Sequence, residues 1–502
     1  MVSITCRKEY KNQQKEPENM FTTKCRKFKG EIENYLRIGQ NHFDVQIDRA
    51  FCSLKIKTWL CRSNILKRDG YPASHLLLVL FMLPVLRLKT INTFCNKQWY
   101  QWSAAQKDTF YRFKKRAYRW RSFLYQVILE ISQQLWFDKD PAQDRYFVID
   151  DSVIQKRGKS MQNVSFVYDH SLGRTVLGYC VVTLGLFTGN GFYPIDFSYW
   201  FSKTCHPKSP DKNIGDPRSV SGQMSYEANS YSKPELAIRM IKRAVSSGLR
   251  AGYVLFDSWY AWPSFINEIR GISPDLHVVC RLKDSKTRYE YRGKRYQLSE
   301  LYQKVKGSLK KSKRTGLLLQ RVTITMPGSN ENGTIVFAKG YCEPQQDTVK
   351  GKKKAKEPPW VAFLSTDTHL HAATIIKKYT KRWSVEVFFK ESKQLLGLGK
   401  EQSNSFQAQV FATTNSFLRY ALLNYLNERE YKTSTGDLFE VLADGSAIIT
   451  YARKLWDFFR GLFEISFSNI FELFQIEDDF QSYCSVIDQT LCKSAAFRGC
   501  ET

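Results

Sequence analysis

The chain has 502 residues, of which 76 are lysine or arginine and 48 are aspartate or glutamate, so its formal charge is +28 and its pI is near 9.5. This length predicts about two to four domains, and the positive charge predicts a polyanionic partner such as nucleic acid, because each neutralised phosphate releases counterions. The longest apolar run, Leu76 to Leu86, is too short for a bilayer and contains a proline, so we expect no membrane partner and a cytoplasmic location.

The twelve cysteines are scattered from Cys6 to Cys500, and no two of them form a Cys-x-x-Cys pair. In a long chain without a secretion signal they are expected to be reduced thiols. Cys205 and His206 come nearest to a metal-binding motif, but a second pair of ligands is missing. We therefore expect no structural zinc site.

Residues 1–140 are predicted to form a mostly helical DNA-binding region. Its informative element is one helix over residues 109–136, whose first half is basic and whose second half repeats apolar residues at core spacing. A basic helical end anchored by an apolar one suits phosphate contacts. The candidate contacts are Lys114, Lys115, Arg116 and Arg119. A basic face that only adds solubility explains this segment equally well.

Residues 141–283 are predicted to form the first part of an α/β core. A short apolar strand ends at Asp150 and Asp151, and two long strands follow over residues 174–201. A capping box at residues 232–235 begins a helix, and the next apolar strand ends at Asp257. A helix and another strand come after it. Asp257 has an alternative role, because an aspartate after a strand can cap the following helix.

A basic turn follows the strand that carries the two aspartates. It contains Lys156, Arg157 and Lys159, of which Lys156 and Lys159 are our candidates for DNA contacts. An ordinary surface turn explains the same residues equally well.

The second half of the chain divides into three regions by composition. Residues 284–359 are basic and rich in short β-strand patterns, which indicates an insertion, and residues 360–430 restore a buried strand and a helix as the second part of the core. Residues 431–502 are predicted to be a helical C-terminal region, either a dimer surface or a small subdomain. The fold class is therefore α/β, with a mixed sheet flanked by helices, a β-rich insertion before the last core helix, and helical terminal regions.

The helix predicted over residues 379–393 places four functional side-chain types in one stripe. At about 100° per residue, Arg382, Glu386 and Lys393 lie within a narrow sector that also contains Tyr379. The neighbouring face is apolar and is expected to pack in the core; it comprises Val385, Phe388, Phe389, Leu395 and Leu396. A solvated face of ion pairs is the alternative explanation for this stripe.

The acids at the ends of these elements favour a metal site. The acids are Asp151 and Asp257, each at the end of a predicted strand, and Glu386 on the last core helix. A carboxylate at such a position is costly unless a cation lies among the acids. Two divalent ions about 4 Å apart, bridged by these carboxylates, would perform in-line phosphoryl transfer. The sequence therefore predicts Asp151, Asp257 and Glu386 as catalytic residues and metal ligands.

At these residues the sequence resembles a known family. Tyr379, Arg382, Glu386 and Lys393 match the Tyr-(2)-Arg-(3)-Glu-(6)-Lys signature of bacterial insertion-sequence transposases of the DDE type, and "IDDS" and "FDSWY" occur in the family's order. The resemblance covers about residues 145–399 and implies a ribonuclease-H-like core. It also implies cleavage at inverted-repeat DNA ends, followed by attack of the freed 3′-hydroxyl on target DNA.

The resemblance also implies the cofactors, the partners and the roles of the stripe. Two Mg²⁺ ions, with Mn²⁺ able to substitute, would serve the acids, and Tyr379, Arg382 and Lys393 would hold phosphates of the cleaved end. The expected partners are double-stranded terminal repeats and target DNA, bound by a homodimer in the bacterial nucleoid.

The doubled aspartate leaves one assignment open. We choose Asp151 because it directly precedes Ser152, at the position where the family has a threonine after its first catalytic aspartate. Alternation along a strand points Asp150 and Asp151 to opposite sides, so only one of them can be the ligand. The other role for Asp150 is that of a turn or capping acid.

Two other functions are compatible with part of the sequence. A transposase-derived DNA-binding protein without catalysis would not need all three acids, and a ribonuclease-H-like nuclease acting on junctions or RNA would not need the four-residue signature. A cut-and-paste transposase accounts for both the three acids and the four-residue signature. Trp259 and Trp360 are interpreted as core aromatics rather than as platforms for stacking bases.

Overall fold

The computed structural model describes residues 44–96, 103–136, 144–202, 218–341, 360–444, 458–463 and 480–485. The chain divides into two compact units, each described here by itself. The first unit comprises Met1–Thr58, Leu66–Tyr111 and Gly436–Thr502, and the second comprises Trp59–Ile65 and Arg112–Thr435. The lysine cluster at residues 350–356 and most of the C-terminal region lie outside the described residues.

The first unit is helical where it is described. Its helices are α3 (Asp44–Ser53), the start of α4 (Ile56–Arg62), α5 (Ala73–Met82), α6 (Ile91–Asn96) and the start of α7 (Lys107–Lys115). The apolar run noted in the sequence forms α5, which is buried along nearly its whole length, and Phe51 meets Phe81 edge to face at 5.2 Å. Among the described helices, none has the length and apolar character needed to cross a membrane.

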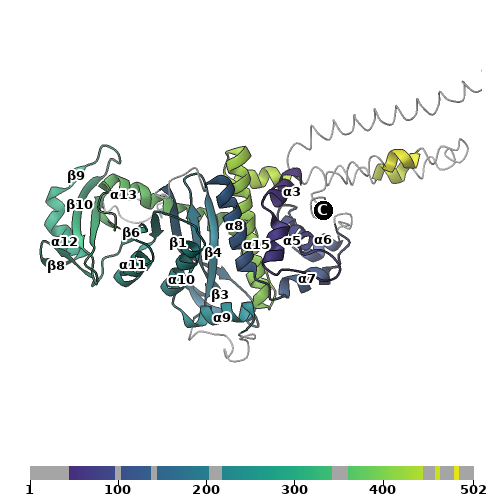
Figure 1. The fold of residues 1–502 in the computed structure, drawn as a ribbon, viewed down its shortest axis with the longest axis horizontal. Coiled ribbons are helices and arrows are strands. Elements are labelled where there is room, and N and C mark those ends of the chain that lie inside the picture. Colours follow the sequence, from purple (N-terminus) through teal and green to yellow (C-terminus); the bar gives the residue numbers. More distant parts are fainter. Residues whose placement is uncertain are drawn as a thin grey trace, which may run out of the picture. The chain divides into compact units, whose positions relative to one another are not determined.

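The second unit is built on a mixed sheet of twelve strands (Figure 1). Its core strands are β1 (Tyr146–Gln155), β3 (Arg174–Phe187), β4 (Phe192–Trp200), β5 (Tyr253–Phe256) and β6 (His277–Leu282), with β2 (Ser165–Asp169) on the outer side of β3. β1, β3 and β4 form an antiparallel meander, whereas β1, β5 and β6 are parallel. The order β4-β3-β1-β5-β6 is that of a ribonuclease-H-like fold, as expected.

The meander follows from its local sequence. The β-rich runs of β3 and β4 are joined by a turn in which Gly189 has a φ of +92° and the Thr188 amide donates to the Gly191 carbonyl at 3.1 Å. At Gly185 a β-carbon would lie 2.1 Å from the Phe192 ring, so only glycine allows the two strands to approach there. Both predicted strands are confirmed.

Helices cover both faces of the core sheet. α14 (Trp383–Gln394) packs on β1 and β4, and α10 (Lys233–Ser246) packs on β3 and β4. The capping box that begins α10 is present, with both Ser232 and Glu235 bonds formed. α8 (Trp120–Leu135) and α15 (Phe406–Leu426) lie side by side against β4 (Figure 1), and α15 is buried along almost its entire length.

The β-rich insertion extends the core sheet. It contains β7 (Arg288–Tyr291), β8 (Lys294–Gln297), α12 (Leu298–Val305), β9 (Lys310–Lys311), β10 (Leu318–Thr325) and β11 (Asn332–Lys339). β11 pairs antiparallel with β12 (Trp360–Ser365), which in turn pairs with β6. Trp360 is half-buried and stacks on Tyr302 at 4.5 Å. Trp259, in the connection after β5, is 46% exposed, so its interpretation as a core aromatic is wrong.

The single basic helix predicted over residues 109–136 is wrong. α7 ends at Lys115 and α8 begins at Trp120, with an irregular turn between them. The break has a packing reason, because Phe113, Tyr118 and Trp120 all turn inward and contact one another edge to face or tilted at 5.4 to 5.7 Å. Burying three rings from consecutive turns requires a change of direction that one straight helix does not permit.

Candidate active site

Asp150 and Asp151 point to opposite faces of β1, as alternation requires. Asp150 Oδ2 lies 3.3 Å from Arg382 Nη1, on the face that α14 covers. Asp151 Oδ2 lies 2.7 Å from Lys233 Nζ at the start of α10, on the other face. The choice between the two aspartates is therefore a choice between two different environments.

Arg382 joins two acids that are far apart in the sequence. Its guanidinium contacts Asp150 on β1 and, through Nη2, Glu386 Oε1 at 2.5 Å one helical turn away. Burial lowers the pKa of Arg382, but the surrounding acidic groups, Tyr379, Asp150, Glu386 and Asp257 in decreasing order, outweigh it and raise the pKa. The same guanidinium thus lies in the field of all three carboxylates.

Asp150 is held in a site that disfavours its own charge. Burial raises the pKa of Asp150 to about 7; Arg382 lowers it, and the neighbouring charges of Asp151 and Glu386 add to the increase. The single guanidinium therefore compensates only part of the negative charge of this group. An additional cation among these carboxylates would relieve the remainder.

The expectation that the first strand ends at Asp150 and Asp151 is wrong, because β1 continues to Gln155 through its pairing with β3. Asp257 follows β5 directly and lies level with Asp150 in the middle of β1. β1 and β5 are parallel with Ile149 opposite Phe256, so the next residues in both strands are neighbours. The Asp257 side chain makes no capping bond to the 3-10 helix η4 (Ser258–Tyr260) that follows. Its alternative interpretation as a helix cap is therefore not supported.

Asp151 lies in a second buried cluster that the sequence did not predict. Besides Lys233, it accepts hydrogen bonds from the Tyr260 hydroxyl at 3.0 Å and from the Cys180 thiol at 3.2 Å. The side chains of Asp151 and Lys233 are each less than one fifth exposed. Asp151 is thus already satisfied by three protein groups. No local motif indicates this, because the donors come from β3, α10 and η4.

The predicted helix over residues 379–393 is divided by a tighter turn. α13 (Ala372–Tyr379) is followed by the 3-10 helix η6 (Thr380–Arg382) and then by α14. This change of pitch turns Tyr379 into the core, where its ring contacts Phe363 at 4.9 Å and lies 5.6 Å from the Arg382 guanidinium. The apolar face is confirmed for Val385, Phe388 and Phe389, which are buried.

Lys393 is half-buried in the last turn of α14. Burial lowers its pKa, and the acid that opposes this most is Asp169 on β2. Arg382, by contrast, is in direct contact with Asp150 and Glu386.

The predicted DNA-contact residues divide into buried and exposed groups. Lys114 is buried and forms an ion pair with Glu401 at 2.5 Å, and Lys156 Nζ donates to the carbonyls of Gly399 and Glu401 at 2.9 and 2.6 Å. Burial lowers the pKa of Lys156 to about 8. Both lysines therefore hold the chain around residue 400 in this structure. The exposed candidates are Lys115, Arg116, Arg119 and Lys159.

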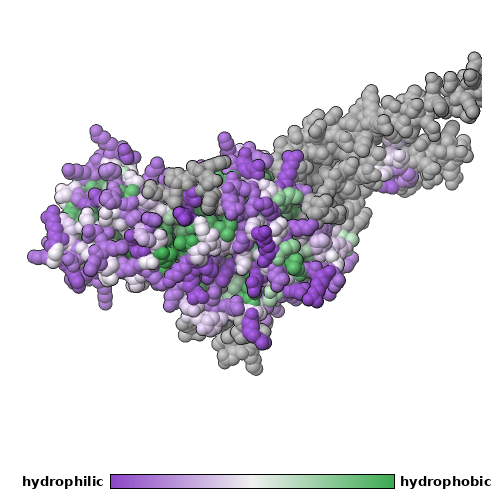
Figure 2. Space-filling view, in the orientation of Figure 1, coloured by the Kyte–Doolittle hydropathy of each residue, from purple (hydrophilic) through white to green (hydrophobic). Residues whose placement is uncertain are grey.

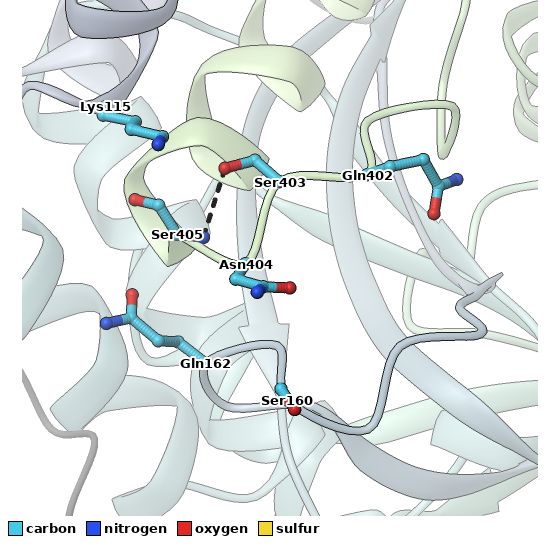
Figure 3. A pocket seen from close by; sticks show the side chains of 7 residues that line it. All are labelled: Lys115, Ser160, Gln162, Gln402, Ser403, Asn404 and Ser405. Atoms are coloured by element: carbon cyan, nitrogen blue, oxygen red, sulfur yellow. Dashed lines mark hydrogen bonds between the residues drawn. The ribbon is translucent and has the colours of Figure 1, made fainter.

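One exposed candidate lines a polar cavity. Lys115 borders a cavity of about 450 Å³ whose other lining residues are all uncharged and polar (Figure 3); they are Ser160, Gln162, Gln402, Ser403, Asn404 and Ser405. The face shown in Figure 2 is mostly hydrophilic, with small hydrophobic patches. Lys115 thus remains accessible to an anionic partner, in contrast to its neighbour Lys114.

No preassembled cation cage exists in the described part of the chain. There, no three histidine, cysteine, aspartate or glutamate side chains lie close enough together to hold a metal ion as they stand. Six of the twelve cysteines lie in the described part of the chain, where each is a free thiol. Arg382 lies between Asp150 and Glu386, at the point where the carboxylate oxygens converge.

Comparison with known proteins gives two family matches. Residues 76–299 match the family described as DDE superfamily endonuclease, and residues 228–422 match the transposase DDE domain. No curated protein matches the chain. Among solved structures, the piggyBac transposase in a synaptic complex with hairpin DNA is similar over 83% of this chain and 83% of that chain, with 11% identity and a TM-score of 0.43. Each family match covers less than half of the chain, and both are to DDE-type domains.

Proposed function

We propose that this protein is the transposase of a bacterial insertion sequence, which binds terminal inverted repeats, cleaves at the element ends and joins the 3′-hydroxyl ends to target DNA. The observation that carries the proposal is the contact of Arg382 with both Asp150 on β1 and Glu386 on α14, beside Asp257, which follows the neighbouring strand β5. Carboxylates placed together on a ribonuclease-H-like sheet suit phosphoryl transfer.

The acidic cluster fits a pair of divalent ions. Its donors are hard carboxylate oxygens, which Mg²⁺ and Mn²⁺ prefer, and the half-buried Asp150 has a raised pKa because Arg382 compensates only part of its charge. When bound, the ions would activate the attacking hydroxyl and stabilise the leaving oxygen. Asp150, Asp257 and Glu386 would hold them.

We favour Asp150 over Asp151 as the first ligand. Asp150 shares Arg382 with Glu386, whereas Asp151 is bound by Lys233, Tyr260 and Cys180 on the opposite face. The sequence motif predicts Asp151 as the metal ligand, whereas in this proposal Asp151 has a structural role.

The protein's own cations would position the DNA. Arg382 can exchange its carboxylate contacts for a forked contact to the scissile phosphate once other cations neutralise the acids. Tyr379 would support the guanidinium from the core. Lys393, together with the exposed Lys115, Arg116, Arg119 and Lys159, would contact phosphates of the end DNA, and a homodimer would bring two ends together.

The test is cleavage of DNA that flanks the protein's own gene, in the presence of Mg²⁺ or Mn²⁺. Asp150→Asn, Asp257→Asn and Glu386→Asn should each abolish strand cleavage and keep binding of end DNA within a few fold, because they disable the chemistry and leave the phosphate contacts. The matched control is Asp151→Asn, which should keep some cleavage.

If Asp151→Asn abolishes cleavage and Asp150→Asn keeps it, Asp151 is the metal ligand instead of Asp150, and the proposed function still holds. Wild-type protein that binds end DNA and never cleaves it would instead indicate a DNA-binding protein without catalysis. Cleavage of junctions or RNA with no preference for the element ends would indicate a different ribonuclease-H-like nuclease.

A further inference from the structure

A row of aromatic rings crosses the sheet four residues before the acids. It takes one residue from each of four neighbouring strands, and these residues are paired in register: Phe187 on β3, Tyr146 on β1, Tyr253 on β5 and His277 on β6. Successive ring centres are 6.1, 5.9 and 5.9 Å apart. Because Tyr146 precedes Asp150 by four residues, both side chains point to the same face of β1, the face that α14 covers.

Two lysines lie over this aromatic row. Lys378, in the last turn of α13, has its Nζ 3.9 Å from the centre of the Tyr253 ring and 5.1 Å from that of Tyr146, and it donates to the Tyr146 hydroxyl at 3.2 Å. Lys381, in η6, has its Nζ 5.3 Å from the centre of the Phe187 ring. Both lysines are half-buried. A cation that is partly withdrawn from water interacts more strongly with an aromatic face than an exposed one does.

The Tyr253 ring is itself held in place. Its hydroxyl donates to Asp367 Oδ2 at 2.7 Å, and Asp367 lies in the connection between β12 and α13. The other carboxylate oxygen of Asp367 accepts from the His369 amide at 3.0 Å. α13 is therefore tied to β5 twice, through Asp367 before its first turn and through Lys378 in its last turn.

The two lysines flank the turn that carries Arg382. A 3-10 turn has poorer hydrogen-bond geometry than an α-helix, so η6 is the point at which α14 could pivot relative to α13. Lys378 contacts rings of β1 and β5, whereas Lys381 contacts a ring of β3, on the other side of β1. A pivot at η6 would move Arg382 and Glu386 away from Asp150, and the contacts on both sides of β1 oppose it.

We propose that Lys378 and Lys381 are positioning residues, whose contacts with the aromatic row fix α14 so that Arg382 and Glu386 are held against Asp150. This inference rests on the proposed function for the role of the acids. Neither lysine contacts DNA or a metal ion in this role, because each acts through the backbone of η6. Removing groups that orient metal ligands typically costs about 10- to 100-fold in metal affinity or activity.

The experiment compares four variants with the wild type. Lys378→Met and Lys381→Met keep an unbranched apolar side chain and remove the charge, and Lys378→Arg keeps a cation that also binds aromatic faces. The matched control is Lys377→Met, because Lys377 is the neighbouring lysine on α13 and is exposed. Calorimetry measures Mn²⁺ affinity without DNA, and single-turnover assays measure the cleavage rate at saturating end DNA. Binding of end DNA in EDTA and melting curves are recorded for each variant.

We expect Lys378→Met to weaken Mn²⁺ binding about 10-fold, because the ligands on α14 lose their fixed distance from Asp150. Its cleavage rate should fall about 10- to 100-fold, as expected for a reacting group misplaced by up to about 1 Å. Binding of end DNA in EDTA should be unchanged. Lys378→Arg should recover most of both losses, Lys381→Met should show smaller losses, and Lys377→Met should match the wild type.

Three results would overturn the inference. The first is a lower melting temperature in Lys378→Met with wild-type Mn²⁺ affinity and cleavage rate, which would limit Lys378 to stability. The second is an equal loss in Lys377→Met, which would indicate a general effect of charge. The third is the absence of any recovery in Lys378→Arg. If Lys378→Met does not fold, Lys381→Met decides, and wild-type affinity and rate in that variant would refute the inference.

Failure of this inference is distinguishable from failure of the proposed function. Mn²⁺ affinity requires no cleavage, and Asp257→Asn shows whether the bound Mn²⁺ lies at the acids. A wild type that binds Mn²⁺ there and never cleaves end DNA would refute only the proposed function. Wild-type cleavage and Mn²⁺ affinity in both Lys378→Met and Lys381→Met would refute only this inference.

Discussion

Arg382 is the residue on which the candidate site depends. It is 5% exposed and compensates Asp150 and Glu386, which would otherwise repel each other across the space between β1 and α14. The same forked geometry that binds two carboxylates also matches a phosphate. The guanidinium can therefore stabilise the free site and bind DNA in turn.

Replacing Arg382 separates these two roles. Arg382→Lys keeps the charge and loses the fork, so cleavage should fall by roughly a hundredfold, the cost of misplacing a reacting group by about 1 Å. Arg382→Ala should abolish cleavage and also lower the melting temperature, because two partly buried acids lose the guanidinium that they share. Cleavage time courses measure the rate, and melting curves measure the melting temperature.

The control is Arg157→Ala in the exposed turn, which should change neither quantity. If Arg382→Lys cleaves DNA at the wild-type rate, the role of Arg382 is limited to stability.

At the scale of the element, the break between α7 and α8 decides which basic side chains face solvent. Lys114 turns inward to Glu401 and Arg121 turns inward to Glu227, whereas Lys115, Arg116 and Arg119 stay exposed. Two of the six cations of this segment therefore contribute to folding instead of to the charged surface.

Neutralising variants should distinguish these two groups. Lys114→Ala should lower the free energy of unfolding by about 3 kcal/mol, because it leaves Glu401 without its partner at a largely buried site. The triple change of Lys115, Arg116 and Arg119 to alanine should leave stability within about 0.5 kcal/mol. That triple variant should instead reduce the salt slope of end-DNA binding by up to about three units. An unchanged slope would assign the exposed residues to solubility.

The ion pair between α8 and α9 (Val220–Ser230) predicts how stability depends on pH. Burial raises the pKa of Glu227, but Arg121, at 3.0 Å, and two further arginines lower it below the usual value of 4.5. A depressed carboxylate pKa contributes stability that is fully present above pH 4.5 and is lost as the pH falls through the folded-state pKa. The difference in unfolding free energy between wild type and Glu227→Gln should therefore shrink below pH 4.5. Denaturant titrations at pH 6 and pH 3.5 measure it, and a constant difference would contradict the prediction.

At the scale of the whole molecule, one continuous sheet connects the catalytic core to the insertion. β11 and β12 continue the pairing that begins at β6, so residues 288–339 are built onto the edge of the core. Asp150 lies on β1 inside this sheet, where β3 and β5 pair with it on either side, while Asp257 follows β5 and Glu386 lies on α14. The large excess of positive charge is then available for long-range attraction of DNA.

Divalent ions should stabilise the whole protein if the acids bind them. Ligands that bind only the folded state add about 2.7 kcal/mol at a hundredfold excess over their Kd. Mg²⁺ or Mn²⁺ should therefore raise the melting temperature of the wild type, and EDTA should reverse the increase. Asp257→Asn should remove most of it, and Asp151→Asn should retain it. An equal response in all three proteins would place the bound ions elsewhere.

The sequence by itself determined the local features. The two β-rich runs of β3 and β4, the capping box of α10 and the apolar face of α14 each depend on residues a few positions apart, and all three are present in the structure. The sequence also placed an acid directly after β5, because a polar residue after a buried strand is visible in the chain, whereas the end it gave to β1 was wrong, since pairing with β3 continues that strand to Gln155.

Only the tertiary structure decided which partner each side chain meets. Alternation showed that Asp150 and Asp151 point apart, but the contact of Asp150 with Arg382 joins residues 232 positions apart, and that of Lys114 with Glu401 spans 287. Periodicity gives the relative direction of side chains within an element, whereas the identity of the element packed on each face depends on long-range pairing. For the same reason the burial of Lys156 and the exposure of Trp259 could not be predicted from the residues around them.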